Sequence, residues 1–285
     1  MTELHDDLVM SRWASIASFR LYLLLFFLAS CGYVLAQSTT TSPYSLTILS
    51  YNIHGGVGSD GSRNLARQAE VIRMQKPDIV LLQEVEVGTK QSGETDQAAE
   101  LARLLEMQVH FAKASDTDGG EKGNAILANT PLDNTRTLPL SNNGSASVAQ
   151  VSLGNNADSP RLTIASLQLS TRIGAQSTQA QTLTKALSGD QIAICMGDFN
   201  ADPNFPVMAY LKDHWKIAAK QGSPLTTPAE APEHETSYFI YKPQEAFILR
   251  SHRVVPDNIA STHRPLLTVI QFDPKKLKST ASDKS

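Results

Sequence analysis

The sequence predicts an α/β fold in which two packed β-sheets are flanked by helices. Strand-like and helix-like segments alternate along the 285-residue chain from Ser45 onward. The strand-like runs are too numerous for one doubly wound sheet, so two packed sheets fit the pattern better. Hydrophobic residues make up 41% of the chain, enough for a sizeable core. No internal repeat or linker is visible, so we expect one large domain over residues 45–272.

The first part of this domain contains two predicted strand–helix pairs. Residues 46–52 form an apolar strand, and the helix after it ends before Pro77. The buried face of that helix is formed by Leu65, Ala69 and Ile72. Residues 79–83 form a second buried strand, and Thr95 is the expected cap of the next helix. The apolar stripe of the second helix is formed by Ala98, Leu101 and Leu105.

The rest of the domain is predicted to be rich in strands. The next four strands fall at residues 109–112, 125–128, 146–153 and 162–169. A polar, exposed helix is expected over 176–187, followed by a strand over 192–196 that lacks polar alternation and should be covered on both faces. After it come a short helix near 207–211 and strands at 238–241, 247–254 and 266–272. The Lys/Ser-rich tail, 273–285, is predicted to be disordered.

Polar residues follow the buried strand 192–196 directly. Asp198 and Asn200 lie two residues apart, so in an extended chain their side chains point the same way. The alternative is an ordinary surface turn, because Gly197, Asp198 and Asn200 are turn-forming residues and Asp202-Pro203 follows. The recurrence of this arrangement elsewhere in the chain favours a functional site.

Two other strands end in the same way. Asn52 ends the first strand, and Glu84 follows four aliphatic residues and Gln83. A carboxylate next to such a strand is costly to bury unless it is paired or binds a metal. Asp198 and Asn200 complete a set of two carboxylates and two amides without sulfur. Such oxygen-rich sites suit a hard ion such as Mg²⁺, which keeps water and substrate phosphate in its remaining positions.

Five segments of the chain form an ordered set of motifs. They are Ser50-Tyr51-Asn52-Ile53-His54-Gly55-Gly56, Pro77-Asp78-Ile79-Val80-Leu81-Leu82-Gln83-Glu84-Val85, Gly123-Asn124-Ala125-Ile126-Leu127, Gly197-Asp198-Phe199-Asn200-Ala201-Asp202-Pro203 and His263-Arg264-Pro265-Leu266. In this order they resemble the endonuclease/exonuclease/phosphatase superfamily. The resemblance covers roughly Ser45 to Phe272, and five segments in order are far more specific than any one alone.

The resemblance implies a four-layer α/β/β/α sandwich of two mixed sheets with outer helices, and it assigns roles to the strand-end residues. Glu84 would ligate the divalent ion, with Asn52 in support. Asp198 would orient or deprotonate the attacking water, Asn200 would bind the scissile phosphate, and His263 would stabilise the charge on that phosphate. The chemistry implied is in-line attack of water on a phosphoester, assisted by the metal.

The chain departs from the family pattern at three positions. Gln168 stands where the family has histidine, and Ser237 and Thr262 stand where it has aspartates. Gln168 can still donate a hydrogen bond but cannot carry charge, and the histidine at 263 loses the carboxylate that orients it. His54 and Asn124, which belong to matching segments, are expected to line the cleft.

These features predict a phosphodiesterase or phosphomonoesterase, weakened by the three substitutions. The cofactor expected is Mg²⁺ or Mn²⁺, bound with reduced affinity because two carboxylates are lost. The alternative is a catalytically inactive relative that binds a phosphorylated ligand or a partner. The class of phosphoester stays open among DNA, lipid and sugar phosphates, since surface loops decide it.

Charge indicates little about partners. The net charge is −3 and no long run of Lys or Arg is present, so the chain has no strong nucleic-acid signature. We expect a monomer whose partner is its phosphoester substrate.

The amino end predicts export. Leu21 to Ala36 is an apolar run with basic residues before it and small residues at its end, which is typical of a signal peptide over 1–36. Met10 gives a more ordinary start than Met1, because it removes an acidic stretch. An uncleaved membrane anchor and lipidation at Cys31 are the alternatives. In each case the domain is periplasmic, secreted or anchored outside the cytoplasm. Cleavage leaves Cys195 alone, as a small core residue.

Overall fold

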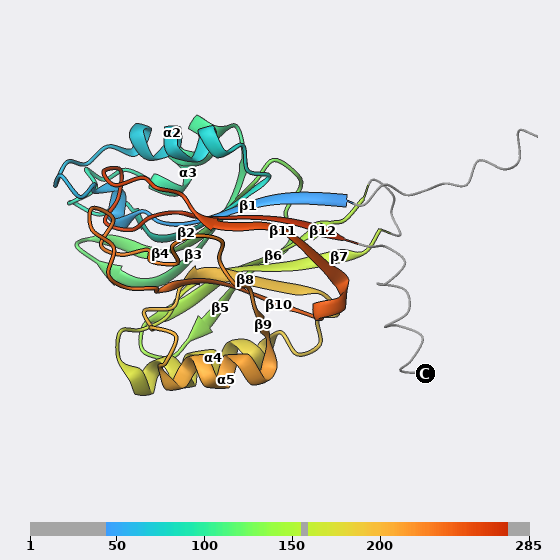
Figure 1. Ribbon diagram of the computed structural model, residues 1–285. Coiled ribbons are helices and arrows are strands. Elements are labelled where there is room, and N and C mark those ends of the chain that lie inside the picture. The colour runs from blue at the N-terminus through green and yellow to red at the C-terminus, as the bar shows by residue number, and fades with distance from the viewer. Residues whose placement is uncertain (1–43, 155–158, 273–285) are drawn as a thin grey trace, which may run out of the picture. The chain divides into compact units, whose positions relative to one another are not determined.

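A computed structural model describes residues 44–154 and 159–272. Within this part of the chain, two six-stranded sheets pack face to face and helices cover their outer faces (Figure 1). The predicted fold, an α/β/β/α sandwich of two mixed sheets, is confirmed. The predictions for 1–36, Cys31 and 273–285 concern residues outside the described ranges. No helix of the described residues has the length and apolar character needed to span a membrane.

The first sheet holds the strands that contribute Asn52 and Glu84. Its strands, in spatial order, are β11 (Phe247–Val254), β12 (Leu266–Phe272), β1 (Tyr44–Asn52), β2 (Ile79–Val87), β4 (Gly120–Ala128) and β3 (Gln108–Thr117). Helices α2 (Leu65–Gln75) and α3 (Gln97–Leu105) cover its outer face (Figure 1). The short 3₁₀ turn η1 (His54–Gly56) follows β1 directly.

The second sheet holds the strand that contributes Asp198. Its strands are β5 (Asp133–Leu140), β6 (Gly144–Ser152), β7 (Arg161–Gln168), β8 (Ala193–Asp198), β10 (Ser237–Lys242) and β9 (Lys216–Ile217). Helices α4 (Ile173–Ala186) and α5 (Pro206–His214) lie on its outer face (Figure 1). A second 3₁₀ turn, η2 (Gln244–Ala246), precedes β11.

Each sheet contains one parallel pair near its centre. The strands β1 and β2 run parallel in the first sheet, and β7 and β8 run parallel in the second. Parallel strands present their carboxyl ends at the same edge of a sheet. The polar residues that end these four strands are therefore neighbours within each sheet.

The apolar strands of the sequence are covered on both faces, as predicted. In β8, Ile194 and Met196 pack between the sheets, whereas Ala193 and Cys195 pack toward α4 and α5. Cys195 is fully buried, and burial raises the pKa of its thiol. Its surroundings match the predicted role of a small core residue.

Two predictions of secondary structure were wrong, and two strands, β5 and the two-residue β9, were not predicted. The cap of α3 is Asp96, whose carboxylate accepts a hydrogen bond from the Ala99 amide (2.9 Å), rather than Thr95. Helix α4 was expected to be exposed, but two of its polar residues, Gln176 and Gln179, are buried. Strand β5 was missed because it is a largely exposed edge strand without an apolar face.

Buried His252 should make stability depend on pH. Its Nδ1 contacts the Thr268 hydroxyl at 2.8 Å, while its Nε2 is buried with no partner among the described residues. Burial, and secondarily the Lys220 charge, lowers the pKa of His252 to about 3. The unfolded chain therefore binds a proton that the folded protein excludes, and stability falls as pH drops from the unfolded pKa of about 6.5 toward 3.

We expect His252→Gln to remove this contribution, which amounts to about 1.4 kcal/mol per pH unit in that window. Urea unfolding at pH 7.5, 6 and 5 measures it, with exposed His214→Gln as the matched control. Equal pH slopes in His252→Gln and wild type would contradict the assignment.

Candidate active site

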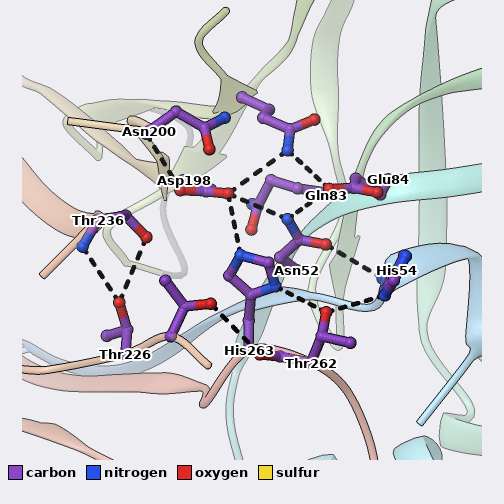
Figure 2. A network of polar contacts seen from close by, with 12 residues as sticks. Asn52, His54, Gln83, Glu84, Asp198, Asn200, Thr226, Thr236, Thr262 and His263 are labelled. Atoms are coloured by element: carbon purple, nitrogen blue, oxygen red, sulfur yellow. Dashed lines mark hydrogen bonds and ion pairs between the residues drawn. The ribbon is translucent and has the colours of Figure 1, made fainter. Parts of the chain in front are cut away.

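The ends of the two parallel strand pairs meet in one polar cluster. Asn52 ends β1, and its side-chain amide donates to Glu84 Oε1 at 2.8 Å and to Asp198 Oδ2 at 3.1 Å. Gln168 ends β7, lies opposite Asp198 in the strand pairing and donates to the same two oxygen atoms, at 2.8 and 3.4 Å. Figure 2 shows Asn52 between Glu84 and Asp198, with contacts that join the two sheets. Residues more than a hundred positions apart thus share one site.

A β-bulge brings Glu84 into the cluster. In a regular strand Glu84 would face the helices, since Leu82 packs on that side and Gln83 reaches Ser166 on the opposite sheet. The pairing of β2 with β4 shifts register between Leu82 and Val85, and Glu84 adopts a left-handed conformation (φ 56°). Such bulges re-aim a side chain next to active sites, at a cost in backbone strain. Here the bulge turns the carboxylate toward Asn52 and Gln168.

Lys122 forms an ion pair with Glu84. Its ammonium lies 2.8 Å from Glu84 Oε2, and the carboxylate is only 15% exposed. Burial by itself would raise the pKa of Glu84. The charge and hydrogen bond of Lys122 and the hydrogen bonds from Asn52 and Gln168 outweigh burial and lower this pKa to about 2. Glu84 is therefore ionised at neutral pH with both of its oxygen atoms occupied.

Asp198 is fully buried and surrounded by hydrogen-bond donors. Its Oδ1 accepts from the Asn200 backbone amide at 3.1 Å. On the other side, His263 Nε2 lies 3.5 Å from Oδ2, the atom that Asn52 and Gln168 also contact. These contacts fix the carboxylate and leave His263 as its single ionisable partner in the described cluster.

Two histidines share one hydroxyl beside Asp198. Thr262 Oγ1 lies 2.8 Å from His54 Nδ1 and 3.1 Å from His263 Nδ1 (Figure 2). The His54 backbone amide donates to Asn52 Oδ1 at 3.0 Å, and Ser261 Oγ donates to the Asn52 carbonyl at 2.7 Å. His263 therefore has a contact at each ring nitrogen. The aspartate expected at 262 is replaced by a group that links the two imidazoles.

The other predicted residues lie around this cluster. The Asn200 side chain donates to the Leu169 carbonyl at 2.8 Å, so its amide braces the loop after β7. Ser237 is buried and lies directly opposite Asp198 across β10 and β8, which places both side chains on one face. Asn124 lines a cavity that Glu84 and Gln168 also line.

Lys122 is the principal site residue that the sequence did not predict. It precedes Gly123 in β4 and reaches Glu84 only because β4 pairs with the bulged part of β2. A lysine within a strand does not by itself indicate a functional site. Its position could have been found only from the pairing of the two strands.

The cluster has the type of ligand that a divalent ion prefers, but its hydrogen bonds would have to rearrange for an ion to bind. Its acidic ligands, Glu84 and Asp198, offer the oxygen atoms that Mg²⁺ prefers. However, both oxygens of Glu84 and Oδ2 of Asp198 already accept N–H donors. No group of three or more His, Cys, Asp or Glu side chains suited to a metal exists among the described residues. An ion at Glu84 would compete with Lys122.

The comparisons with known proteins agree with this fold. The sequence profile of the Endonuclease/Exonuclease/phosphatase family matches residues 49–253. No curated protein matches the chain. Similar solved structures include an endonuclease/exonuclease/phosphatase from Beutenbergia cavernae DSM 12333, which is 21% identical over 80% of this chain and 72% of its own, with a TM-score of 0.64.

Two further structures are similar over most of their length. The human Nocturnin catalytic domain, solved with a bound sulfate anion, is 21% identical over 81% of this chain and 96% of its own, with a TM-score of 0.64. ANGEL2, described as a 2′,3′-cyclic phosphatase, is 12% identical over 81% of this chain and 96% of its own, with a TM-score of 0.65.

Proposed function

The chain belongs to the endonuclease/exonuclease/phosphatase family, whose members are hydrolases that act on phosphoester bonds, and on this premise we propose that it is an exported, metal-assisted phosphoesterase. The observation that carries the proposal is the convergence of Asp198, Glu84 and His263 with two amide side chains at one edge of the sheets. Export rests on the apolar run from Leu21 to Ala36.

Asp198 is the group that would orient a water molecule and accept its proton. Its carboxylate is held by the Asn200 amide and by Asn52, so its position is set before substrate binds. The His263 imidazole beside it would donate a hydrogen bond to negative charge that develops on the phosphoryl group, and the Gln168 amide would donate another there.

A divalent ion, when bound, would neutralise phosphate charge at this edge. Glu84 is the residue that would hold it, with Asn52 beside it, and Mg²⁺ or Mn²⁺ suits these oxygen ligands. The affinity should be low because the Lys122 ammonium lies on the same carboxylate.

We expect Lys122→Met to bind Mg²⁺ at least about tenfold more tightly than wild type. Two unit charges about 4 Å apart repel by about 4 kcal/mol at an effective dielectric constant near 20. Solvent screens the partly exposed Lys122 ammonium, and a remaining repulsion of about 1.4 kcal/mol is already a factor of ten in affinity. Calorimetric titration with MgCl₂ measures this without any turnover. The matched control is Lys113→Met on the adjacent strand, whose ammonium pairs with exposed Asp116 at 2.6 Å. Equal Mg²⁺ affinity in Lys122→Met and wild type would show that Lys122 does not compete.

The direct test of the function is hydrolysis by the purified protein. Bis-p-nitrophenyl phosphate, p-nitrophenyl phosphate, plasmid DNA and sphingomyelin should be supplied with Mg²⁺ or Mn²⁺ and, separately, with a chelator. The proposal predicts turnover of at least one substrate above the blank that the chelator lowers. Turnover indistinguishable from the blank on all four would reject it.

One observation favours a second candidate, an inactive relative that binds a phosphorylated ligand. Glu84 is already neutralised by Lys122, and Gln168, Ser237 and Thr262 supply no charge where the family pattern has charged groups. This candidate predicts that phosphate esters bind but are not hydrolysed. The same hydrolysis panel, run beside a binding measurement, separates the two functions.

A further inference from the structure

The hydroxyl of Thr262 joins two histidines that come from distant parts of the chain. Its Oγ1 lies 2.8 Å from His54 Nδ1 and 3.1 Å from His263 Nδ1 (Figure 2). A hydroxyl has one hydrogen, so it can donate to only one of these nitrogens, and the other must donate to it if both contacts are hydrogen bonds. The direction of the two bonds therefore decides which ring nitrogens carry hydrogen.

The Asp198 carboxylate sets this direction at the other nitrogen of His263. Its Oδ2 lies 3.5 Å from His263 Nε2 and accepts from the side-chain amides of Asn52 and Gln168, at 3.1 and 3.4 Å. A ring nitrogen without hydrogen would turn its lone pair toward this buried, electron-rich oxygen, which is unfavourable. His263 Nε2 therefore carries a hydrogen that points at Asp198.

The other bonds of the series follow from that hydrogen. In a neutral imidazole only one ring nitrogen carries hydrogen, so His263 Nδ1 is an acceptor. Among the described residues, the Thr262 hydroxyl is the one donor within hydrogen-bonding distance of this nitrogen. Thr262 therefore donates to His263 and accepts from His54 Nδ1. The result is a single directed series from His54 through Thr262 and His263 to Asp198.

Other hydrogen bonds hold the chain on both sides of this hydroxyl. The Ala229 amide donates to the Thr262 carbonyl at 2.8 Å, and Ser261 Oγ donates to the Asn52 carbonyl at 2.7 Å. The His54 backbone amide donates to Asn52 Oδ1 at 3.0 Å. None of these bonds uses the Thr262 hydroxyl, so its removal should release the His263 ring without unfolding the loop.

We propose that Thr262 is a positioning residue that keeps His263 in the tautomer with hydrogen on Nε2, so that the imidazole presents an N–H to the site. The hydroxyl thereby orients His263 in place of the carboxylate that this chain lacks. The catalytic part of the inference rests on the proposed function, in which that N–H donates to negative charge developing on the phosphoryl group.

Nitrogen-15 NMR of the wild-type protein, labelled at histidine and held at about pH 8.5, tests the tautomer directly. In a neutral ring the nitrogen that carries hydrogen and the bare nitrogen have well-separated shifts, and each ring is assigned from the variant that replaces it with asparagine. We expect the hydrogen of His263 on Nε2 and that of His54 on Nδ1. A hydrogen on His263 Nδ1, or none on His54 Nδ1, would overturn the proposal.

Thr262→Val keeps the shape of the side chain and removes the hydroxyl. We expect kcat for the best substrate to fall about tenfold, the rate equivalent of one lost hydrogen bond, with KM within about twofold of wild type. The two nitrogen shifts of His263 should move toward each other, because Nδ1 has lost the donor that favours its bare form.

Thr262→Ser restores the hydroxyl and should return both kcat and the His263 shifts to wild-type values. The matched control is Thr178→Val, the same exchange at an exposed threonine of α4 whose hydroxyl donates to the Gly174 carbonyl at 3.2 Å. It should behave as wild type.

Unchanged His263 shifts in folded Thr262→Val would refute the positioning role, and so would Thr262→Ser as slow as Thr262→Val, since the methyl group would then matter. If Thr262→Val does not fold, the wild-type spectrum still decides. If the wild-type protein hydrolyses no substrate of the panel, the spectra still test the position of hydrogen on His263. The hydrolase can therefore be rejected while the positioning role stands.

Discussion

Asp198→Asn is expected to lower kcat for the best phosphoester substrate by about 10²- to 10⁴-fold, the usual contribution of a general base. The amide cannot accept the proton of the attacking water. The side chains of Asn52, Gln168 and His263 all contact the Asp198 carboxylate, so its replacement disturbs the whole cluster. Initial rates at saturating substrate, with the melting temperature of each protein, measure the effect.

The matched control for this prediction is Asp213→Asn, which neutralises an exposed aspartate on α5. It should retain wild-type turnover. If Asp198→Asn folds and turns over substrate as fast as Asp213→Asn, then Asp198 is not the base, and the roles given to its neighbours lose their foundation.

Gly197→Ala is expected to lower the free energy of unfolding by about 3 kcal/mol, because it overpacks the centre of the second sheet. A Cβ at Gly197 would lie 1.8 Å from the Leu167 carbonyl oxygen on the parallel strand β7. The strands would have to separate where Gln168 lies opposite Asp198. We therefore expect the variant to lose stability and activity together.

Gly174→Ala on α4 is the control for this substitution, since a Cβ there meets no atom within 4 Å. Alanine favours a helix over glycine, so this variant should gain up to about 1 kcal/mol. Urea unfolding of the three proteins measures both changes. A Gly197→Ala protein as stable as wild type would mean that the strand spacing at β7 and β8 is adaptable.

Apolar periodicity predicted most of the elements correctly. The strands in the middle of the sheets were found because both of their faces are buried, which gives continuous apolar runs such as residues 192–196. Strand β5 was missed because an exposed edge strand needs no apolar face, and its partner β6 supplies its backbone pairing. The cap at Asp96 was misplaced by one residue, since Thr95 is an equally good capping residue type.

The candidate site could be predicted in part because its residues follow buried strands. A carboxylate or amide at the end of an apolar run stands out in a sequence, which is how Asn52, Glu84 and Asp198 were found. Site residues that do not follow an apolar run have no such pattern around them in the sequence. The hydroxyl of Thr262 contacts His54, which lies 208 positions away in the chain.

The sequence by itself determined most of the strands and helices and their order, the apolar faces that form the core, and the strand ends that carry polar groups. These depend on local spacing, which is readable along the chain. Only the tertiary structure decided that Glu84 turns back at a bulge toward Asn52, that Lys122 neutralises it, and that Thr262 joins two imidazoles. These features depend on strand register and on the packing of two sheets, which bring together groups that share no pattern in sequence.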